Sequence, residues 1–240
     1  MERGADWMRT LVIGDIHGEL AMVQALVKKV KYDSSQDELI FLGDYIDRGP
    51  DSKGVIAFMK QLQQSGAICL SGNHEQIMYE AFKNRSTESW LHWLHTAGGA
   101  ATLKSYGFDT EDIEHSMSPE SFVTAEIEED LEWIRSLETY VERDDYIFVH
   151  GGVDPEVPLS ITPKHRLLWI RQEFHDNYRG KKTVVFGHTP TPRLHKERGN
   201  FAVYFGDNNI IGLDGGAVFG GALHCLVLPT REIVSIDAKG

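Results

Sequence analysis

Six side chains of the kinds that bind divalent metal ions stand beside glycines at the ends of short apolar runs. They are Asp15, His17, Asp44, Asn73, His150 and His188. Imidazole, carboxylate and carboxamide groups together suit Mn, Fe or Zn better than they suit Ca or an all-thiolate zinc centre. Asp15 and His17 are two positions apart, so in extended backbone both side chains project to one side and can hold one ion. Asp44 can bridge to a second ion, because a carboxylate has two oxygens.

The elements that must position these side chains alternate between strand and helix. Short apolar runs predict strands at residues 10–13, 38–42 and 67–70. Helices are expected at residues 20–30, at 52–64 with Ser52 as the N-cap, and from Glu75 onward. Open α/β sheets bind their ligands beyond the carboxyl ends of the strands. The three polar loops that follow these strands are therefore expected to meet at one site.

The middle of the chain has a different character. Residues 84–139 are acidic, helical in pattern and rich in tryptophan, and they contain neither a strand signal nor a chemical motif. We interpret them as a helical insertion within one catalytic domain, residues 1–240. His92 and His95 lie there at helical spacing without a carboxylate partner, so we assign them to an amphipathic face and not to a metal site.

Strand patterns return after the insertion. They are expected at residues 146–149 and 183–186, which run into His150 and His188, and then at residues 201–205, 210–213, 223–228 and 232–236. The last four alternate with turns and predict an antiparallel meander. The glycine-rich residues 212–221 lack the Lys-Ser/Thr pair of a phosphate-binding loop, so we interpret them as tight turns.

The charge balance restricts the partners. Asp and Glu number 36 against 24 Lys and Arg, a formal net charge of −12, which disfavours duplex nucleic acid. Bound metal ions can still supply local positive charge for a phosphate group. Cys69 and Cys225 form no CxxC pair, so neither a disulfide scaffold nor a thiolate zinc site is indicated. No apolar run approaches the roughly 18 residues of a membrane span, and we expect a cytoplasmic protein without a membrane partner. No pattern predicts the oligomeric state.

Five blocks together resemble one known family. In order along the chain they are Gly14-Asp15-Ile16-His17-Gly18, Gly43-Asp44-Tyr45-Ile46-Asp47-Arg48-Gly49, Gly72-Asn73-His74-Glu75, His150-Gly151-Gly152 and Gly187-His188. They look like the signature blocks of the phosphoprotein phosphatase type of metallophosphoesterase, in its bacterial and phage branch. The resemblance implies an α/β fold of four layers, in which a central mixed β-sandwich is flanked by helices and carries the helical insertion.

The resemblance also assigns roles to individual residues. It implies that Asp15, His17 and Asp44 hold the first metal, and that Asp44, Asn73, His150 and His188 hold the second. Arg48 and Arg171 resemble the two arginines that clamp the phosphate, with Asn73 also on the substrate side. His74 resembles the general acid, and Asp47 the carboxylate that orients it. Two alternatives stay open: Arg171 could form a surface salt bridge near Arg166, and Asp47 could be a local turn residue.

The activity implied is hydrolysis of phosphomonoesters by in-line attack of a hydroxide that bridges two divalent ions, with Mn expected and Fe or Zn as alternatives. The leading function is a serine/threonine protein phosphatase, with phosphotyrosine as a further substrate. The alternative is a dinucleotide hydrolase similar to symmetrical diadenosine tetraphosphatase. Ser71 stands where eukaryotic members usually carry Arg, which argues against eukaryotic-type regulatory subunits.

Overall fold

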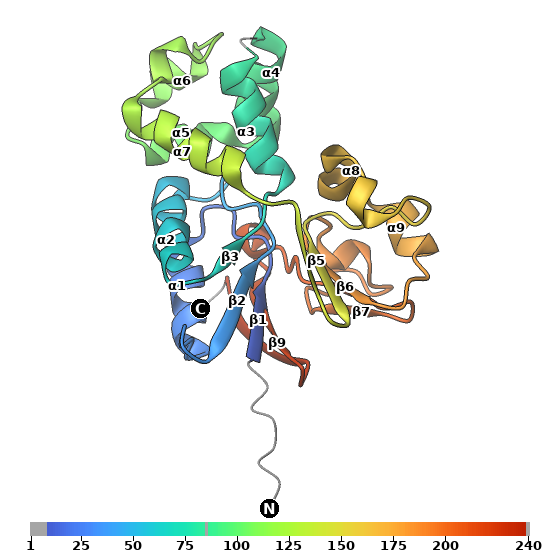
Figure 1. Ribbon diagram of the computed structural model, residues 1–240. Coiled ribbons are helices and arrows are strands. Elements are labelled where there is room, and N and C mark those ends of the chain that lie inside the picture. Colours follow the sequence, from blue (N-terminus) through green and yellow to red (C-terminus); the bar gives the residue numbers. More distant parts are fainter. Residues whose placement is uncertain (1–8, 85, 239–240) are drawn as a thin grey trace, which may run out of the picture.

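Two five-stranded sheets form the centre of the protein (Figure 1). The computed structural model describes residues 9–84 and 86–238. The first sheet has the strand order β10-β9-β1-β2-β3, and the second has β4-β5-β6-β8-β7. Each sheet mixes parallel and antiparallel pairs. The predicted α/β fold, a mixed β-sandwich flanked by helices, is confirmed.

The first sheet is built from both ends of the described chain. Its strands are β1 (Arg9–Ile13), β2 (Asp37–Phe41), β3 (Ile68–Cys69), β9 (Ala222–Leu228) and β10 (Glu232–Asp237). The helices of this half are α1 (Leu20–Lys29), α2 (Ser52–Gln64) and α3 (Asn73–Lys83). The predicted N-cap of α2 is wrong by one residue, because the Asp51 carboxylate accepts the Gly54 N–H at 2.8 Å. Helix α3 begins two residues before the predicted start, so Asn73 and His74 lie in its first turn.

The second sheet follows the insertion. Its strands are β4 (Tyr140–Arg143), β5 (Tyr146–Val149), β6 (Thr183–Phe186), β7 (Tyr204–Gly206) and β8 (Ile210–Gly212). Two short helices, α8 (Lys164–Trp169) and α9 (Gln172–Asn177), lie beside it (Figure 1). The predicted meander is wrong: β7 and β8 form an antiparallel pair in the second sheet, β8 runs parallel to β6, and β9 and β10 belong to the first sheet.

Side chains alternate between the two faces of each strand and so fill three layers of core. Val12, Ile40 and Leu226 of the first sheet meet Phe148 and Val185 of the second in one buried cluster between the sheets. The opposite face of β1 packs towards α1 and α2, and the opposite face of the second sheet packs against α8 and α9. Because both faces are covered, the inner strands β1, β2, β5 and β6 are largely apolar, which explains why apolar runs predicted them.

The insertion folds as a helical cap at one end of the molecule, drawn in green in Figure 1. It contains α4 (Thr87–Leu91), a π-helix (His92–Ala97), α5 (Gly99–Ser105), α6 (Thr110–Glu114), a short 3₁₀ turn (Glu120–Phe122) and α7 (Ala125–Ser136). Its core is aromatic, with Trp90 and Trp93 fully buried beside Phe82 of α3. His92 and His95 are exposed, as the assignment to an amphipathic face predicted. No strand occurs in the described part of residues 84–139.

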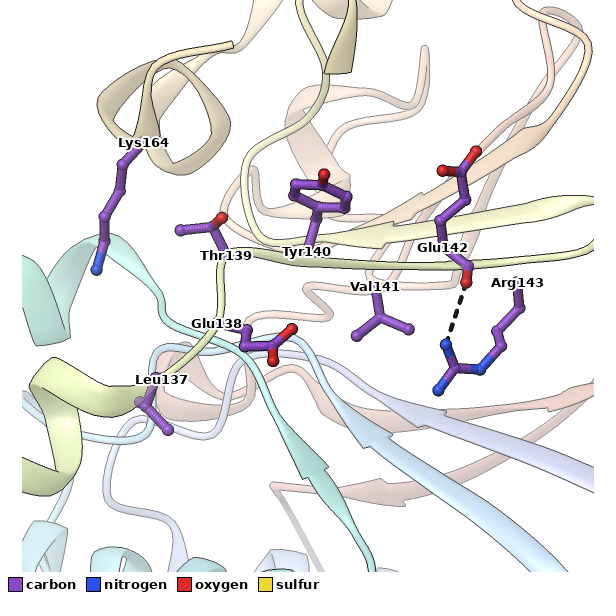
Figure 2. Close-up of a pocket in the computed structure, with 8 residues that line it drawn as sticks. All are labelled: Leu137, Glu138, Thr139, Tyr140, Val141, Glu142, Arg143 and Lys164. Atoms are coloured by element: carbon purple, nitrogen blue, oxygen red, sulfur yellow. Dashed lines mark hydrogen bonds between the residues drawn. The ribbon is translucent and has the colours of Figure 1, made fainter. Parts of the chain in front are cut away.

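The segment that leaves the insertion connects the two sheets. The Glu138 carbonyl accepts the Ser71 N–H at 2.7 Å, so this segment is fixed to the end of β3 before the chain enters β4. Figure 2 shows the surface groove beside it, with Leu137 at one end, Arg143 at the other and Lys164 of α8 facing it. No candidate site residue lines this groove. No helix among the residues described is long and apolar enough to cross a membrane.

Candidate metal centre

The predicted ligands come together from both sheets. Asp15 follows β1, Asp44 follows β2, Asn73 opens α3, His150 follows β5 and His188 follows β6. All five, and His17 as well, are buried. The structure therefore collects residues that lie up to 173 positions apart in the sequence.

The loops that carry these side chains are held in uncommon backbone conformations. Positive φ angles occur at His17 (47°), Asp44 (55°) and His188 (60°), and at the consecutive residues Asp47 and Arg48 (both 71°). Residues other than glycine rarely adopt this region, and such strain concentrates at functional sites. The expectation that extended backbone aligns Asp15 with His17 is wrong, because a left-handed residue turns the chain at His17.

Asp44 is at the centre of the cluster. Its carboxylate oxygens lie 3.5 Å from His17 Nε2, 3.3 Å from His150 Nε2 and 4.0 Å from His74 Nε2. Burial raises the pKa of Asp44, but the surrounding histidines outweigh burial and hold the pKa far below its usual range. Asp44 is therefore ionised, which is the form that binds a cation.

Two groups of side chains with ligand atoms within 4.8 Å of one another occur among the described residues, and both contain Asp44. One is His17, Asp44 and His74; the other is Asp44, His150 and His188. The second group contains three of the four residues predicted to hold one ion, the fourth being Asn73. The first contains His74 in place of Asp15. Asp15 instead accepts the His188 backbone N–H at 3.0 and 3.1 Å, and burial, followed by the charges of Asp214 and Asp44, raises its pKa.

The hydrogen bonds of the histidines leave ligand atoms facing inward. His17 Nδ1 donates to the Ile46 carbonyl at 2.8 Å and His150 Nδ1 to the Leu42 carbonyl at 2.9 Å, which leaves each Nε2 as an acceptor. His150 Nε2 lies 2.9 Å from the Asn73 side-chain oxygen, which is also an acceptor. The buried His188 Nε2 has no hydrogen-bond partner among the residues that the structure describes. Two acceptor atoms only 2.9 Å apart, such as His150 Nε2 and the Asn73 oxygen, fit a site for cations.

The protonation state of these histidines also suits metal binding. Burial is the largest cause that lowers the pKa of His17, His150 and His188 below the ordinary histidine value. Neutral imidazole is the form that ligates a metal ion. The residues present therefore fit the two divalent ions that the sequence pattern predicted.

One arginine lies at each half of the cluster. Arg48 Nη1 is 2.6 Å from His17 Nε2. Arg171, which precedes α9 and does not lie within a helix, donates from Nη1 to the His188 carbonyl and to Thr189 Oγ1, both at 3.0 Å. Arg166 instead pairs with Asp154 at 2.9 Å and with Glu173 at 2.6 Å. The surface salt bridge considered for Arg171 is therefore made by Arg166.

His74 and Asp47 form a buried dyad beside the cluster. His74 Nδ1 lies 2.7 Å from Asp47 Oδ2. Burial lowers the pKa of His74, but the charge of Asp44 and the hydrogen bond that His74 donates to Asp47 outweigh burial and raise the pKa overall. Asp47 is fully buried and accepts bonds from other residues of the fold, so it is more than a local turn residue.

Glu75 supports the site, although the sequence pattern assigned it no role. Its carboxylate accepts the backbone N–H groups of Asp44, Tyr45 and Gly72, each at 2.8 Å. Burial and the charge of Asp44 raise its pKa to about 7. Gly72 is required here, because a Cβ atom would lie 2.1 Å from Asp44 Oδ1. The sequence does contain a signal for this role of Glu75. Glu75 stands three residues after Gly72, at the N3 position of α3, where a glutamate side chain can accept backbone N–H groups.

The glycine-rich segment also places residues beside the site, because the charge of Asp214 acts on Asp15. Burial is the largest cause that raises the pKa of Asp214 to about 6, and the Gly216 N–H donates to its carboxylate at 3.0 Å. The exposed Phe219 ring lies 5.3 Å below the Arg48 guanidinium. The turns predicted for this run are present, as a 3₁₀ turn (Ala217–Phe219) between left-handed glycines. Asp214 was not singled out by its sequence context.

The fold and the site together define a phosphoesterase that depends on metal ions. The model of the calcineurin-like phosphoesterase family matches residues 8–221, and the chain belongs to that family. This confirms the relationship that the five sequence blocks indicated.

Relatives in the family differ in the substrate that their names give. The chain is 32% identical over 225 residues to serine/threonine-protein phosphatase 1 of Salmonella typhimurium (strain LT2), with 91% of each chain covered. It is 28% identical over 259 residues to the asymmetrical bis(5'-nucleosyl)-tetraphosphatase PrpE of Bacillus cereus (strain Q1), covering 97% of this chain and 95% of the relative. A crystal structure with the provisional name diadenosine tetraphosphatase aligns with a TM-score of 0.69 at 22% identity, covering 97% and 95% of the two chains. That likeness bears on the fold alone.

Proposed function

We propose that this chain hydrolyses phosphomonoesters with two divalent metal ions, and that its substrates are proteins phosphorylated on serine or threonine, with phosphotyrosine accepted as well. Asp15, His17 and Asp44 would hold one ion, and Asp44, Asn73, His150 and His188 the other. When bound, the ions supply an activated water and positive charge for the phosphate oxygens. The ligand set favours Mn, with Fe or Zn as alternatives.

The placement of the two arginines is the observation that carries this proposal. Arg48 contacts His17 and Arg171 contacts His188, so one guanidinium lies at each half of a cluster that shares Asp44. A guanidinium fork binds two phosphate oxygens at once. Two such forks beside a cation site provide donors for a phosphate dianion from two directions. A site that only stored metal ions would have no use for them.

The His74–Asp47 dyad supplies the proton that the leaving group needs. Because Nδ1 donates to Asp47, the other nitrogen, Nε2, is the one on the Asp44 side of the ring. A protonated imidazole at this place can protonate the departing oxygen and so avoid the release of a free alkoxide. This function matters most for the alkyl leaving groups of phosphoserine and phosphothreonine.

A dinucleoside tetraphosphate is the second candidate substrate. The Salmonella relative supports a protein substrate, whereas the Bacillus relative supports a dinucleotide. The name of the Bacillus relative supports asymmetrical cleavage of the dinucleotide. The sequence resemblance, in contrast, implied symmetrical cleavage. The formal net charge of −12 favours neither candidate, but it disfavours longer nucleic acids.

Turnover on matched substrates separates the candidates. We expect the protein with Mn to show kcat/KM on phosphoserine and phosphothreonine peptides about tenfold or more above that on diadenosine tetraphosphate. The reverse order would assign the dinucleotide, and its products would then distinguish ATP plus AMP from two molecules of ADP. Failure to hydrolyse any of these esters with metal bound would overturn the proposal.

A further inference from the structure

The helical insertion contacts the proton-donor dyad directly. Asp47, which accepts from His74, also accepts the Trp93 indole N–H at 3.1 and 3.2 Å and the Thr102 hydroxyl at 2.7 Å. Trp93 and Thr102 belong to the insertion and are 46 and 55 residues away in sequence. All of these side chains are buried. The carboxylate that orients the acid is therefore itself held by two neutral donors from the cap.

The insertion also holds the backbone on which the dyad is built. Asp47 and Arg48 are consecutive left-handed residues, an arrangement that needs external support. The Asp47 N–H lies 3.0 Å from Thr102 Oγ1, and the Arg48 N–H donates to the Gly98 carbonyl at 3.2 Å. Gly98 has a φ of 95°, and a Cβ atom there would lie 2.9 Å from Arg48 Cγ. The backbone of the insertion thus approaches this loop as closely as glycine allows.

An irregular helix places the indole. Trp93 lies in the π-helix His92–Ala97, and π-helical turns occur frequently at functional sites. Its ring is fixed between Trp90, at a centroid distance of 5.3 Å, and Phe82, at 5.4 Å. A ring packed in this way has little freedom to turn its N–H away from Asp47.

We propose that Trp93 and Thr102 are positioning residues for proton donation by His74, and that this is a function of the helical insertion. They fix both oxygens of Asp47, so the imidazole has one orientation and Nε2 stays directed to the leaving oxygen. The inference rests on the proposed function, because it presupposes that His74 protonates the leaving group.

The test compares two esters that differ in their need for a proton. The leaving group of p-nitrophenyl phosphate departs with little protonation, whereas that of phenyl phosphate needs more. With Mn present, Trp93→Phe and Thr102→Val should lower kcat on phenyl phosphate by about tenfold, since each removes a hydrogen bond to a charged group. On p-nitrophenyl phosphate the loss should be at most about twofold, and KM should stay nearly constant for both esters.

The chain offers a matched control for each variant. Trp90→Phe removes an equally buried indole N–H from the same aromatic cluster, but that N–H donates to Ser116 Oγ at 2.9 Å and not to Asp47. Trp90→Phe should therefore leave the ratio of kcat on phenyl phosphate to kcat on p-nitrophenyl phosphate unchanged. Thr102→Ser keeps the hydroxyl and should restore the ratio that Thr102→Val alters.

The outcomes separate this inference from the function on which it rests. If Trp93→Phe and Thr102→Val lower both activities equally, as a loss of folded protein would, the insertion has a structural role only and the inference is overturned. His74→Asn, measured in parallel, must show the same dependence on the leaving group. If His74→Asn does not, the acid has been assigned wrongly, and the proposed function fails in that part. If Trp93→Phe does not fold, the Thr102→Val and Thr102→Ser pair decides the question.

Discussion

The carboxylate of Asp15 accepts the backbone N–H of His188 at 3.0 and 3.1 Å and so joins a loop of the first sheet to a loop of the second. The candidate ligands are divided between the same two sheets. An ion bound among them would add a second connection at this place. Metal binding and the packing of the sheets are therefore expected to be linked.

Removal of metal should affect both activity and stability. Chelator-treated protein should lose essentially all turnover, and its melting temperature should rise again when Mn is added. Mn at a hundred times its Kd would stabilise the fold by about 2.7 kcal/mol. Thermal unfolding with and without Mn measures the effect. His188→Ala should reduce the Mn-dependent shift, whereas His92→Ala, at an exposed histidine, should keep it. Full turnover in metal-free protein would contradict the assignment.

Replacement of His74 distinguishes an acid from a ligand. His74→Asn should lower kcat by roughly two to four decades, the usual scale for a general acid, while the protein keeps its metal. Elemental analysis and kinetics on the same sample provide the measurement. A role for His74 as a metal ligand also has a structural basis, because His74 is a member of one of the two potential ligand groups. Loss of one metal ion from His74→Asn would make this residue a ligand.

The two arginines should act on substrate and leave the fold intact. Arg48→Ala and Arg171→Ala should each lower kcat/KM by about ten- to a thousandfold, equivalent to about 1.4 to 4 kcal/mol. The double variant should lose less than the sum, because both forks bind one phosphate group. Arg166→Ala is the control, since Arg166 pairs with Asp154 and Glu173. A larger loss for Arg166→Ala than for Arg171→Ala would show that the second clamp is assigned to the wrong residue.

The ion pair between Arg9 and Asp37 should make stability depend on pH. Burial raises the pKa of Asp37, but hydrogen bonds from Arg9 at 2.8 and 2.7 Å and from the Asp33 N–H at 3.0 Å outweigh burial and lower the pKa overall. An acid with a depressed folded-state pKa stabilises the fold above its unfolded-state pKa, near pH 4, and this stabilisation is lost as the pH falls through the folded-state value.

Asp37→Asn should therefore lower the free energy of unfolding by about 1 to 2 kcal/mol at pH 7. The difference from the unchanged protein should shrink as the pH falls below about 4. Urea unfolding between these pH values measures it. Asp144→Asn, at the exposed turn between β4 and β5, should show a much smaller effect. A difference that stays constant down to pH 3 would mean that the ion pair is not its source.

The ligand set could be predicted because its signal is local. Asp44 and His188 each come within three residues of the end of a strand that is largely buried, so the strand and the ligand are close in sequence. The residues that hold Asp47 in place could not be predicted from local sequence signals of this kind. Trp93 and Thr102 reach Asp47 across tens of residues, and a π-helix has no pattern of its own in the sequence.

Strand pairing could not be predicted either, because it too depends on segments that are far apart in the sequence. The pattern at residues 201–236 showed strands and turns, but not that β8 would pair with β6 while β9 paired with β1. Strand β4 was missed, because Glu142 and Arg143 are exposed on an edge strand and interrupt the apolar run. The left-handed backbone at Asp47 and Arg48 has no sequence signal either, since neither residue is glycine.

The pairing of β1 with β9 has a consequence for the order of events during synthesis. All six predicted ligands are part of the nascent chain once residue 188 has been made, yet β1 still lacks one neighbour until residues 222–228 arrive. A nascent chain thus carries every ligand while the central strand of its first sheet has a free edge. Maturation of the metal centre is therefore expected to follow translation of β9, and a ribosome stalled before this strand would hold a chain with the whole ligand set but an unfinished sheet.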